Sequence, residues 1–311
     1  MRTLICGSLA YDTIMVFRDR FDRHILPDKT HMLSVSFTVG DMRREWGGCA
    51  GNIAYNLKAI GGEPVIMATI GDDGAPYRDR LLELGVATDG VMTLAGTFTA
   101  QAFIITDLDD NQITAFHPGA MVRSHELHAG DVAGIELGIV APDGRDGMRQ
   151  HAAEFRAAGI PYIFDPGQGL PLFSGEELVE MLDGAAVVTV NDYEAQLLAE
   201  RTGMSEEALA HRVEAFIVTL GAEGSRIHTG GSTIHVPAVP PRELVDPTGC
   251  GDAYRAGLLY GMSQRWDWQQ SGRLASLLGS LKIAARGGQN HAIDRDTVAL
   301  QFRRQFGTHP W

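Results

Sequence analysis

The chain has 311 residues, 44% of them hydrophobic and 21% charged, a composition typical of globular proteins and sufficient for one large domain or two smaller ones. Its 39 acidic and 26 basic residues give a net charge of −13, which argues against nucleic acid or an anionic membrane as a partner, because both need a dense cationic face. No run of about 18 apolar residues and no signal peptide is apparent, and the three cysteines are far apart, so we expect a cytoplasmic protein without disulfide or zinc framework.

Short apolar runs alternate with amphipathic stretches along most of the chain. The runs of strand length are residues 4–7, 65–70, 137–141, 162–165, 187–191 and 215–220. The stretches of helical length between them include residues 50–60, 77–84, 145–158, 174–182 and 192–201, and residues 252–306 are almost wholly helical in pattern. This alternation predicts an α/β fold whose mostly parallel central sheet is covered by helices on both faces.

Two segments depart from this alternation. Residues 32–46 and 97–116 have the pattern of antiparallel β ribbons, the second with an Asp-Asp-Asn-Gln turn. We therefore expect one α/β domain over residues 1–311, with two insertions, at about 13–47 and 97–118, that form a small β lid. The edge of this lid could pair with a second copy of the chain as a homodimer or move as a flap, and the pattern does not decide between them.

The stretch LVDPTGCGDAYRAGLLYG, residues 244–261, carries the most chemical information. Gly249, Cys250 and Gly251 allow a tight turn, and a helical pattern starts near Asp252. A glycine-rich turn at the start of a helix presents backbone N–H groups and the positive end of the helix dipole, so it forms an anion site suited to phosphate.

Three kinds of phosphate site compete for this stretch. A P-loop is excluded because none of the three lysines, Lys29, Lys58 and Lys282, follows a glycine. A dinucleotide fingerprint has Tyr254 where its third glycine belongs. A kinase site explains Asp252, because a carboxylate there can take the proton of a substrate hydroxyl. Taken alone, Asp252 fits a helix N-cap equally well.

Three motifs together resemble one family. DPTGCGDAYRAG, residues 246–257, is similar to the second signature of the ribokinase-like (PfkB) kinases, D-T-x-G-x-G-D-x-F-x-x-G. GGCAGNIA, residues 47–54, is similar to the first signature, and residues 191–194 match the family's N-x-x-E element. Because all three occur in order over most of the chain, the resemblance implies a three-layer α/β/α ribokinase-like sandwich that uses ATP and Mg²⁺.

Within this family, four further stretches resemble bacterial-type adenosine kinases. They are residues 7–14 (GSLAYDTI), 26–42 (LPDKTHMLSVSFTVGDM), 116–121 (FHPGAM) and 165–170 (DPGQGL). The resemblance implies an adenosine kinase that phosphorylates the 5′-hydroxyl. Gly169, where a second glutamine is usual, and Ala102, where an aromatic residue is usual, are departures that bear on base preference. The alternatives are a kinase for a free sugar and a catalytically silent nucleoside- or sugar-binding protein.

The resemblance also implies roles for individual residues. Asp252 would be the general base, the N–H groups of Gly249, Cys250 and Gly251 would form an anion hole, and Arg255 would reach the γ-phosphate. The acceptor would be bound by Ser8, Asp12, Ser36, Gly48, Asn52, Phe103, Phe116 and Gln168. We expect Asp12 at the end of the first strand, where its carboxylate would accept hydrogen bonds from a ribose diol.

The remaining implied roles concern the nucleotide and cations. ATP would be bound by Asn191, Thr219, Gly221, Gly224 and Gly251, with residues 287–290 as an adenine-side loop. Asn191 and Glu194 would hold Mg²⁺ through water, although a helix cap explains the same pair. Asp246 and Thr248 would contribute to a site for a monovalent cation such as K⁺.

Overall fold

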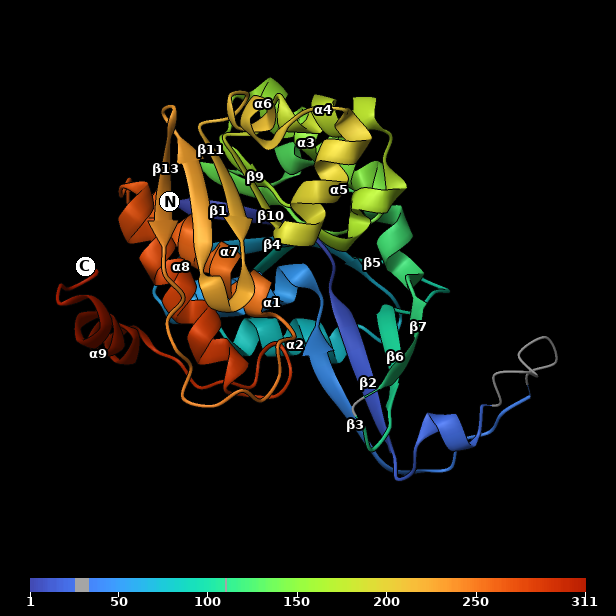
Figure 1. Ribbon diagram of the computed structural model, residues 1–311. Helices are drawn as coiled ribbons and strands as arrows, with labels where there is room; N and C mark the ends of the chain where they lie inside the picture. The colour runs from blue at the N-terminus through green and yellow to red at the C-terminus, as the bar shows by residue number, and fades with distance from the viewer. Residues whose placement is uncertain (26–33, 110) are drawn as a thin grey trace.

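The computed structural model describes residues 1–25, 34–109 and 111–311, which form two sheets and the helices around them (Figure 1). The strands are β1 (Arg2–Cys6), β2 (Ala10–Phe17), β3 (Val39–Gly47), β4 (Glu63–Ile70), β5 (Ala87–Thr93), β6 (Ala100–Thr106), β7 (Gln112–His117), β8 (Leu137–Val140), β9 (Tyr162–Phe164), β10 (Val187–Asn191), β11 (Ala215–Thr219), β12 (Ser225–Thr229) and β13 (Ser232–Val236). The α-helices are α1 (Cys49–Ala59), α2 (Ala75–Glu83), α3 (Arg145–Ala158), α4 (Gly175–Leu182), α5 (Asp192–Thr202), α6 (Glu206–Ala210), α7 (Cys250–Ser263), α8 (Trp268–Ile283) and α9 (Arg295–Phe306). Short 3-10 helices are η1 (Phe21–Arg23), η3 (Gly119–Glu126), η4 (Ala129–Asp131), η5 (Gly167–Leu172) and η6 (Gly221–Glu223).

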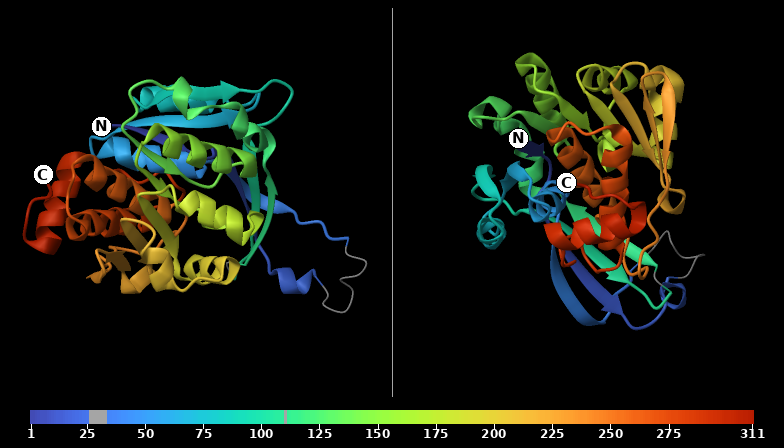
Figure 2. Two further views of the ribbon diagram at one scale, coloured as in Figure 1. Left: turned by 90° about the horizontal axis from the view of Figure 1, so that it is seen from above. Right: turned by 90° about the vertical axis from the view of Figure 1, so that its left-hand side faces the viewer.

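The large sheet has the order β13-β12-β11-β10-β9-β8-β1-β4-β5. The strands from β11 to β5 are parallel to one another, and β12 and β13 are added to one edge in antiparallel pairing. Helices cover both faces of this sheet (Figure 2). The predicted three-layer α/β/α architecture with a mostly parallel sheet is therefore confirmed.

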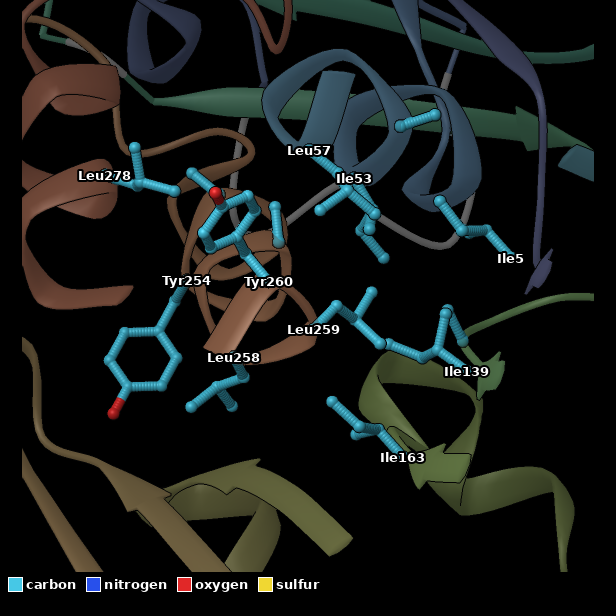
Figure 3. Close-up of a cluster of buried hydrophobic side chains, with 14 of the residues drawn as sticks. Ile5, Ile53, Leu57, Ile139, Ile163, Tyr254, Leu258, Leu259, Tyr260 and Leu278 are labelled. Atoms are coloured by element: carbon cyan, nitrogen blue, oxygen red, sulfur yellow. The ribbon is translucent and has the colours of Figure 1, made fainter. Parts of the chain in front are cut away.

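Alternate residues of each central strand enter two separate cores. Ile5 of β1 packs with α1, α7 and α8, whereas its neighbour Leu4 packs with the core of α3, α4 and α5 on the opposite face. Figure 3 shows the first core, where Ile53 and Leu57 of α1 approach Leu259 of α7 between the strands and α8. Because successive strand residues point to opposite faces, the continuous apolar runs of the sequence supply both cores.

A second, four-stranded sheet has the order β3-β2-β6-β7 and projects from the body (Figure 1). We call it the lid sheet. The prediction that Asp12 ends the first strand is wrong, because β1 ends at Cys6 and Asp12 lies on β2 of the lid sheet. In the sequence the two strands form one nearly continuous apolar run, which hides the bend at residues 7–9. Residues 26–33 of the stretch that resembles adenosine kinases lie outside the described residues.

Helix α7 is tied to the end of β9 by a buried ion pair. The Arg255 guanidinium donates through Nε to Asp165 Oδ2 at 2.9 Å and through Nη2 to Asp165 Oδ1 at 3.0 Å. The two side chains are only 7% and 4% exposed. The pair therefore fixes the start of α7 against the central sheet. No helix in the described part of the chain is both long and apolar enough to cross a membrane.

Removing one partner of this pair leaves a buried charge without compensation. We expect Arg255→Met to lower the free energy of unfolding by about 3–5 kcal/mol, as for other buried pairs. Urea unfolding followed by circular dichroism measures this loss. As a matched control, Arg18→Met breaks an exposed pair with Asp41 and should leave the free energy of unfolding almost unchanged, because solvent screens that pair. Equal losses in the two variants would contradict the structural role of the Arg255 pair.

Candidate active site

Two cavities lie on either side of the N-terminus of α7. The lid-side cavity has a volume of about 600 Å³ and is lined by Ser8, Ala10, Asp12, Gly48, Cys49, Asn52, Ala102, Thr114, Phe116, Met121, Pro142, Asp143, Gln168, Gly169, Pro171, Leu172, Thr248, Gly249 and Asp252. The α8-side cavity measures about 280 Å³ and is lined by Thr219, Gly221, Ala222, Gly224, Ala238, Val239, Pro241, Leu244, Cys250, Gly251, Tyr254, Ser276, Gly279, Ser280 and Ile283. Gly249 and Asp252 face one cavity, and Cys250 and Gly251 face the other.

The turn that starts α7 depends on Gly249. Its φ is +77°, in the left-handed region, and an added Cβ would lie 3.2 Å from the backbone of Gly288. The helix that follows directs its free N–H groups and the positive end of its dipole at the junction of the two cavities. Of the three predicted anion-hole donors, Cys250 is partly engaged, because its N–H donates to Pro247 O at 3.1 Å.

Asp252, in the first turn of α7, has its carboxylate beside the lid-side cavity. Asn52 of α1 donates through Nδ2 to Asp252 Oδ2 at 2.8 Å. Burial raises the pKa of Asp252 to about 6; the hydrogen bond from Asn52 opposes this rise, and the nearby Asp165 carboxylate adds to it. A carboxylate with this pKa is ionised at neutral pH and is more basic than an ordinary aspartate.

Sequence reasoning missed the residues that hold Asn52. Gln289 donates through Nε2 to Asn52 Oδ1 at 3.2 Å and to Tyr77 Oη at 2.6 Å. Residues 287–290 do not border the α8-side cavity, and their role as an adenine-side loop stays a prediction. The loop lies instead against α1 and the lid sheet, where Asn290 donates to Glu45 Oε2 at 2.6 Å.

The acidic group at the base of the lid is Asp12. Burial, reinforced by the Asp246, Glu45 and Asp252 carboxylates, raises the pKa of Asp12 to about 6. Gly48, at φ +84°, brings the start of α1 against the β1–β2 bend, because a Cβ there would lie 2.5 Å from Ser8 O. The Ser8 hydroxyl in turn accepts a hydrogen bond from the Cys49 N–H at 3.2 Å.

The lid sheet brings only some of its predicted residues to the cavity. Phe116 of β7 lines it and pairs with Ala102 of β6, which shares its face. Phe103 and Ser36 do not line the cavity, which corrects their predicted placement. Phe103 follows Ala102 along the same strand, so its ring lies on the opposite face of the lid. Gln168, after β9, lines the cavity as predicted.

A buried carboxylate that the sequence did not single out also lines the lid-side cavity. Asp143 is 5% exposed and follows β8 by three residues. Its Oδ1 accepts a hydrogen bond from the Gly144 N–H at 2.9 Å, whereas Oδ2 has no partner among the described residues. Burial raises the pKa of Asp143 to about 7. Its position directly after a central strand is the signal that could have identified it.

Three of the residues that were predicted to contact the ATP phosphates or Mg²⁺ lie outside the lining of both cavities. Arg255 is engaged by Asp165, and its Nη1 also donates to Gly251 O at 3.3 Å, so in this structure it supports the turn. Asn191 and Glu194 form a reciprocal capping box at the start of α5, with both hydrogen bonds at 2.8 Å. The alternative explanation of this pair as a helix cap is therefore confirmed.

The same pair can still serve a hard cation. In the capping box Glu194 uses only Oε2 among the described residues, and burial raises its pKa. Within residues 1–25, 34–109 and 111–311, no group of three or more His, Cys, Asp or Glu side chains could cage a metal ion. One carboxylate with a free oxygen suits Mg²⁺, which keeps several waters and shares its coordination with substrate phosphates.

The α8-side cavity unites residues from distant parts of the sequence. Thr219, Gly221 and Gly224 line it as predicted. Its other walls are Val239 and Leu244, from the segment after β13, and Ser276 and Ile283 of α8, which sequence reasoning missed. Within the described part of the chain, no charged side chain lines this cavity. Small hydroxyl and apolar groups of this kind suit a flat, neutral ring.

Comparison with known proteins supplies the family. The model of the pfkB family of carbohydrate kinases matches residues 9–295. The chain is similar to a nucleoside kinase of Burkholderia thailandensis in complex with inosine, with 52% identity, 99% of both chains covered and a TM-score of 0.90. The structure of that kinase in complex with ADP-inosine gives 53% identity, 99% and 97% coverage and a TM-score of 0.88.

A second relative shows the same similarity over almost the whole chain. A nucleoside kinase of Methanothermobacter thermautotrophicus is 30% identical over 305 residues, which cover 96% of this chain and 98% of the relative. The family predicted from the three motifs is thus confirmed. The chain belongs to the pfkB family of carbohydrate kinases, phosphotransferases whose acceptor is an alcohol group.

Proposed function

We propose that the protein is an ATP-dependent nucleoside kinase that phosphorylates the 5′-hydroxyl of a purine nucleoside, with adenosine and inosine as its substrates. The observation that carries this proposal is the position of Asp252 at the helix N-terminus that separates the two cavities. The similarity to nucleoside kinases, one of them in complex with inosine and with ADP-inosine, supports it.

The charge of the lid-side cavity limits the acceptor. Asp12, Asp143 and Asp252 line it, and among the residues that the structure describes no Lys, Arg or His side chain does. A sugar phosphate would be repelled there, whereas a neutral nucleoside offers hydroxyl and N–H donors to the carboxylates. In our proposal Asp12 and Asn52 bind the ribose hydroxyls, while Phe116 and Asp143 face the base.

The α8-side cavity takes ATP in this proposal, with the adenine between α8 and the segment after β13. Asp252 removes the proton of the 5′-hydroxyl, whose oxygen bonds to the γ-phosphorus as the bond to the bridging oxygen breaks and ADP leaves. N–H groups at the start of α7 stabilise the charge on the transferred group. Mg²⁺, when bound near Asn191 and Glu194, would neutralise phosphate charge.

A substrate panel tests the proposal. Purified protein is incubated with ATP and Mg²⁺ against adenosine, inosine, guanosine, cytidine, ribose and fructose, and ADP is measured. We expect ADP formation that depends on adenosine and inosine and exceeds that with free sugars. Turnover confined to ribose or fructose would favour the sugar-kinase alternative. No turnover with any compound would favour a silent binding protein.

Replacing the proposed base should separate catalysis from stability. We expect Asp252→Asn to lower kcat by roughly 10²–10⁴-fold, with ATP binding little changed. The melting temperature should not fall, because the amide oxygen still accepts the Asn52 hydrogen bond and the desolvated charge is gone. Steady-state kinetics and thermal unfolding measure both. The exposed Asp296→Asn is the matched control, and more than half of wild-type turnover in Asp252→Asn would remove the residue from this role.

The raised pKa values predict the acid limb of the pH profile. Asp252 and Asp12 both have a pKa of about 6 and are needed in the ionised form, so kcat/KM should be constant above neutrality and fall as the pH drops through about 6. The profile is obtained by measuring kcat/KM in overlapping buffers between about pH 4.5 and about pH 8.5, a range that brackets this pKa. A limb near pH 4, the ordinary range of Asp, would show that neither carboxylate controls the reaction.

A further inference from the structure

Lys282, one of three lysines in the sequence, is buried beneath the turn that starts α7. It lies in the last turn of α8, and its side chain is fully enclosed. The ammonium group donates to Asp246 O and to Ala285 O, both at 2.9 Å. A buried lysine held by two backbone carbonyls is a fixed cation rather than a solvated surface charge.

The same place was expected to hold a monovalent cation, but the oxygens of Asp246, one of its two predicted ligands, bind groups of the protein instead. Asp246 Oδ1 accepts a hydrogen bond from the Thr248 N–H at 2.9 Å, and Oδ2 accepts one from the Gly287 N–H at 2.8 Å. The Asp246 carbonyl binds the Lys282 ammonium. Among the described residues, the predicted ligand Asp246 therefore has its carboxylate and its carbonyl committed within the protein.

The ammonium also lies close to the chain segment that leads into the turn at the start of α7, where the proposed phosphoryl transfer takes place. Asp246 is three residues before Gly249, and its N–H, like that of Val245, donates to Ile283 O at the end of α8. Together with these backbone hydrogen bonds, Lys282 joins the end of α8 to the segment that leads into the turn. Its charge acts on Cys250, Asp246 and Asp252, the groups around the N-terminus of α7.

We propose that Lys282 is a built-in replacement for a monovalent cation, which holds the turn of α7 and supplies a fixed positive charge behind it. The enzyme consequently needs neither K⁺ nor Na⁺. The inference rests on the proposed phosphoryl transfer for its kinetic consequence, whereas the position of the ammonium is a property of the fold. Lys282 touches no substrate in this account, so it is a positioning residue.

The wild-type protein tests the first consequence. Initial rates with ATP, Mg²⁺ and adenosine or inosine are measured in tetramethylammonium chloride and then with K⁺ or Na⁺ at equal ionic strength. We expect the rates to differ by less than about twofold, because the Lys282 ammonium already occupies the cation position and leaves no site for an added cation. Tetramethylammonium is the reference salt because it is too large to enter a K⁺ or Na⁺ site. Activation of more than about tenfold by K⁺ or Na⁺ would overturn the proposal.

Two variants test the second consequence. Lys282→Ala opens a space lined by the Asp246 and Ala285 carbonyls, whereas Lys282→Met removes the charge but fills most of the space. In tetramethylammonium both should lose at least about tenfold in kcat. Added K⁺ or ammonium should restore Lys282→Ala and leave Lys282→Met unchanged. A folded Lys282→Ala that no cation restores, or equal restoration of both variants, would overturn the proposal.

Thermal unfolding separates this inference from the proposed function. K⁺ should raise the melting temperature of Lys282→Ala by about 2 °C or more and leave that of the wild type unchanged, because only the variant has a vacant cation site. This readout needs no turnover. If the wild type forms no ADP with any nucleoside, the proposed function fails, and the K⁺-dependent melting still decides the role of Lys282. If Lys282→Ala does not fold, the cation dependence of the wild type decides it.

Discussion

The left-handed turn at Gly249 is the constraint on which the rest of the site depends. It lets α7 begin between the lid-side and α8-side cavities, so one helix N-terminus faces both. Backbone N–H groups and the helix dipole then favour a negative group at the junction. The same placement partly buries Asp252, and this desolvation raises the pKa of its carboxyl group toward neutrality, which suits it for taking a proton from a hydroxyl.

Two buried cations support this turn from behind. Arg255 joins it to Asp165 at the end of β9, and Lys282 joins the segment before it to the end of α8. Both cations are screened from bulk water, so their charge acts on the turn more strongly than a surface lysine would. A chain with a net charge of −13 can thus offer an anion-binding site without a cationic surface.

The loop of residues 287–290 connects the two sides of the site. Gln289 holds Asn52, which in turn holds Asp252, while Asn290 reaches Glu45 on the lid sheet. Gly287 donates to the Asp246 carboxylate, next to the Lys282 ammonium. A chain of side-chain and backbone hydrogen bonds therefore connects the lid sheet to the base and to the turn of α7.

The sequence by itself determined the family, the layers of the fold and the residues nearest to the chemistry. Apolar runs of strand length and glycine-rich signatures are local patterns, and Gly249 and Asp252 belong to one of them, so they could be recognised without coordinates. Only the tertiary structure decided how the side chains are oriented and which of them lie in contact. The side of the lid to which Phe103 points, the partner of Arg255, the free oxygen of Asp143 and the carbonyls around Lys282 each depend on segments far apart in the chain. Their meeting is set by strand pairing and helix packing over long sequence separations, which leave no signal in the local pattern.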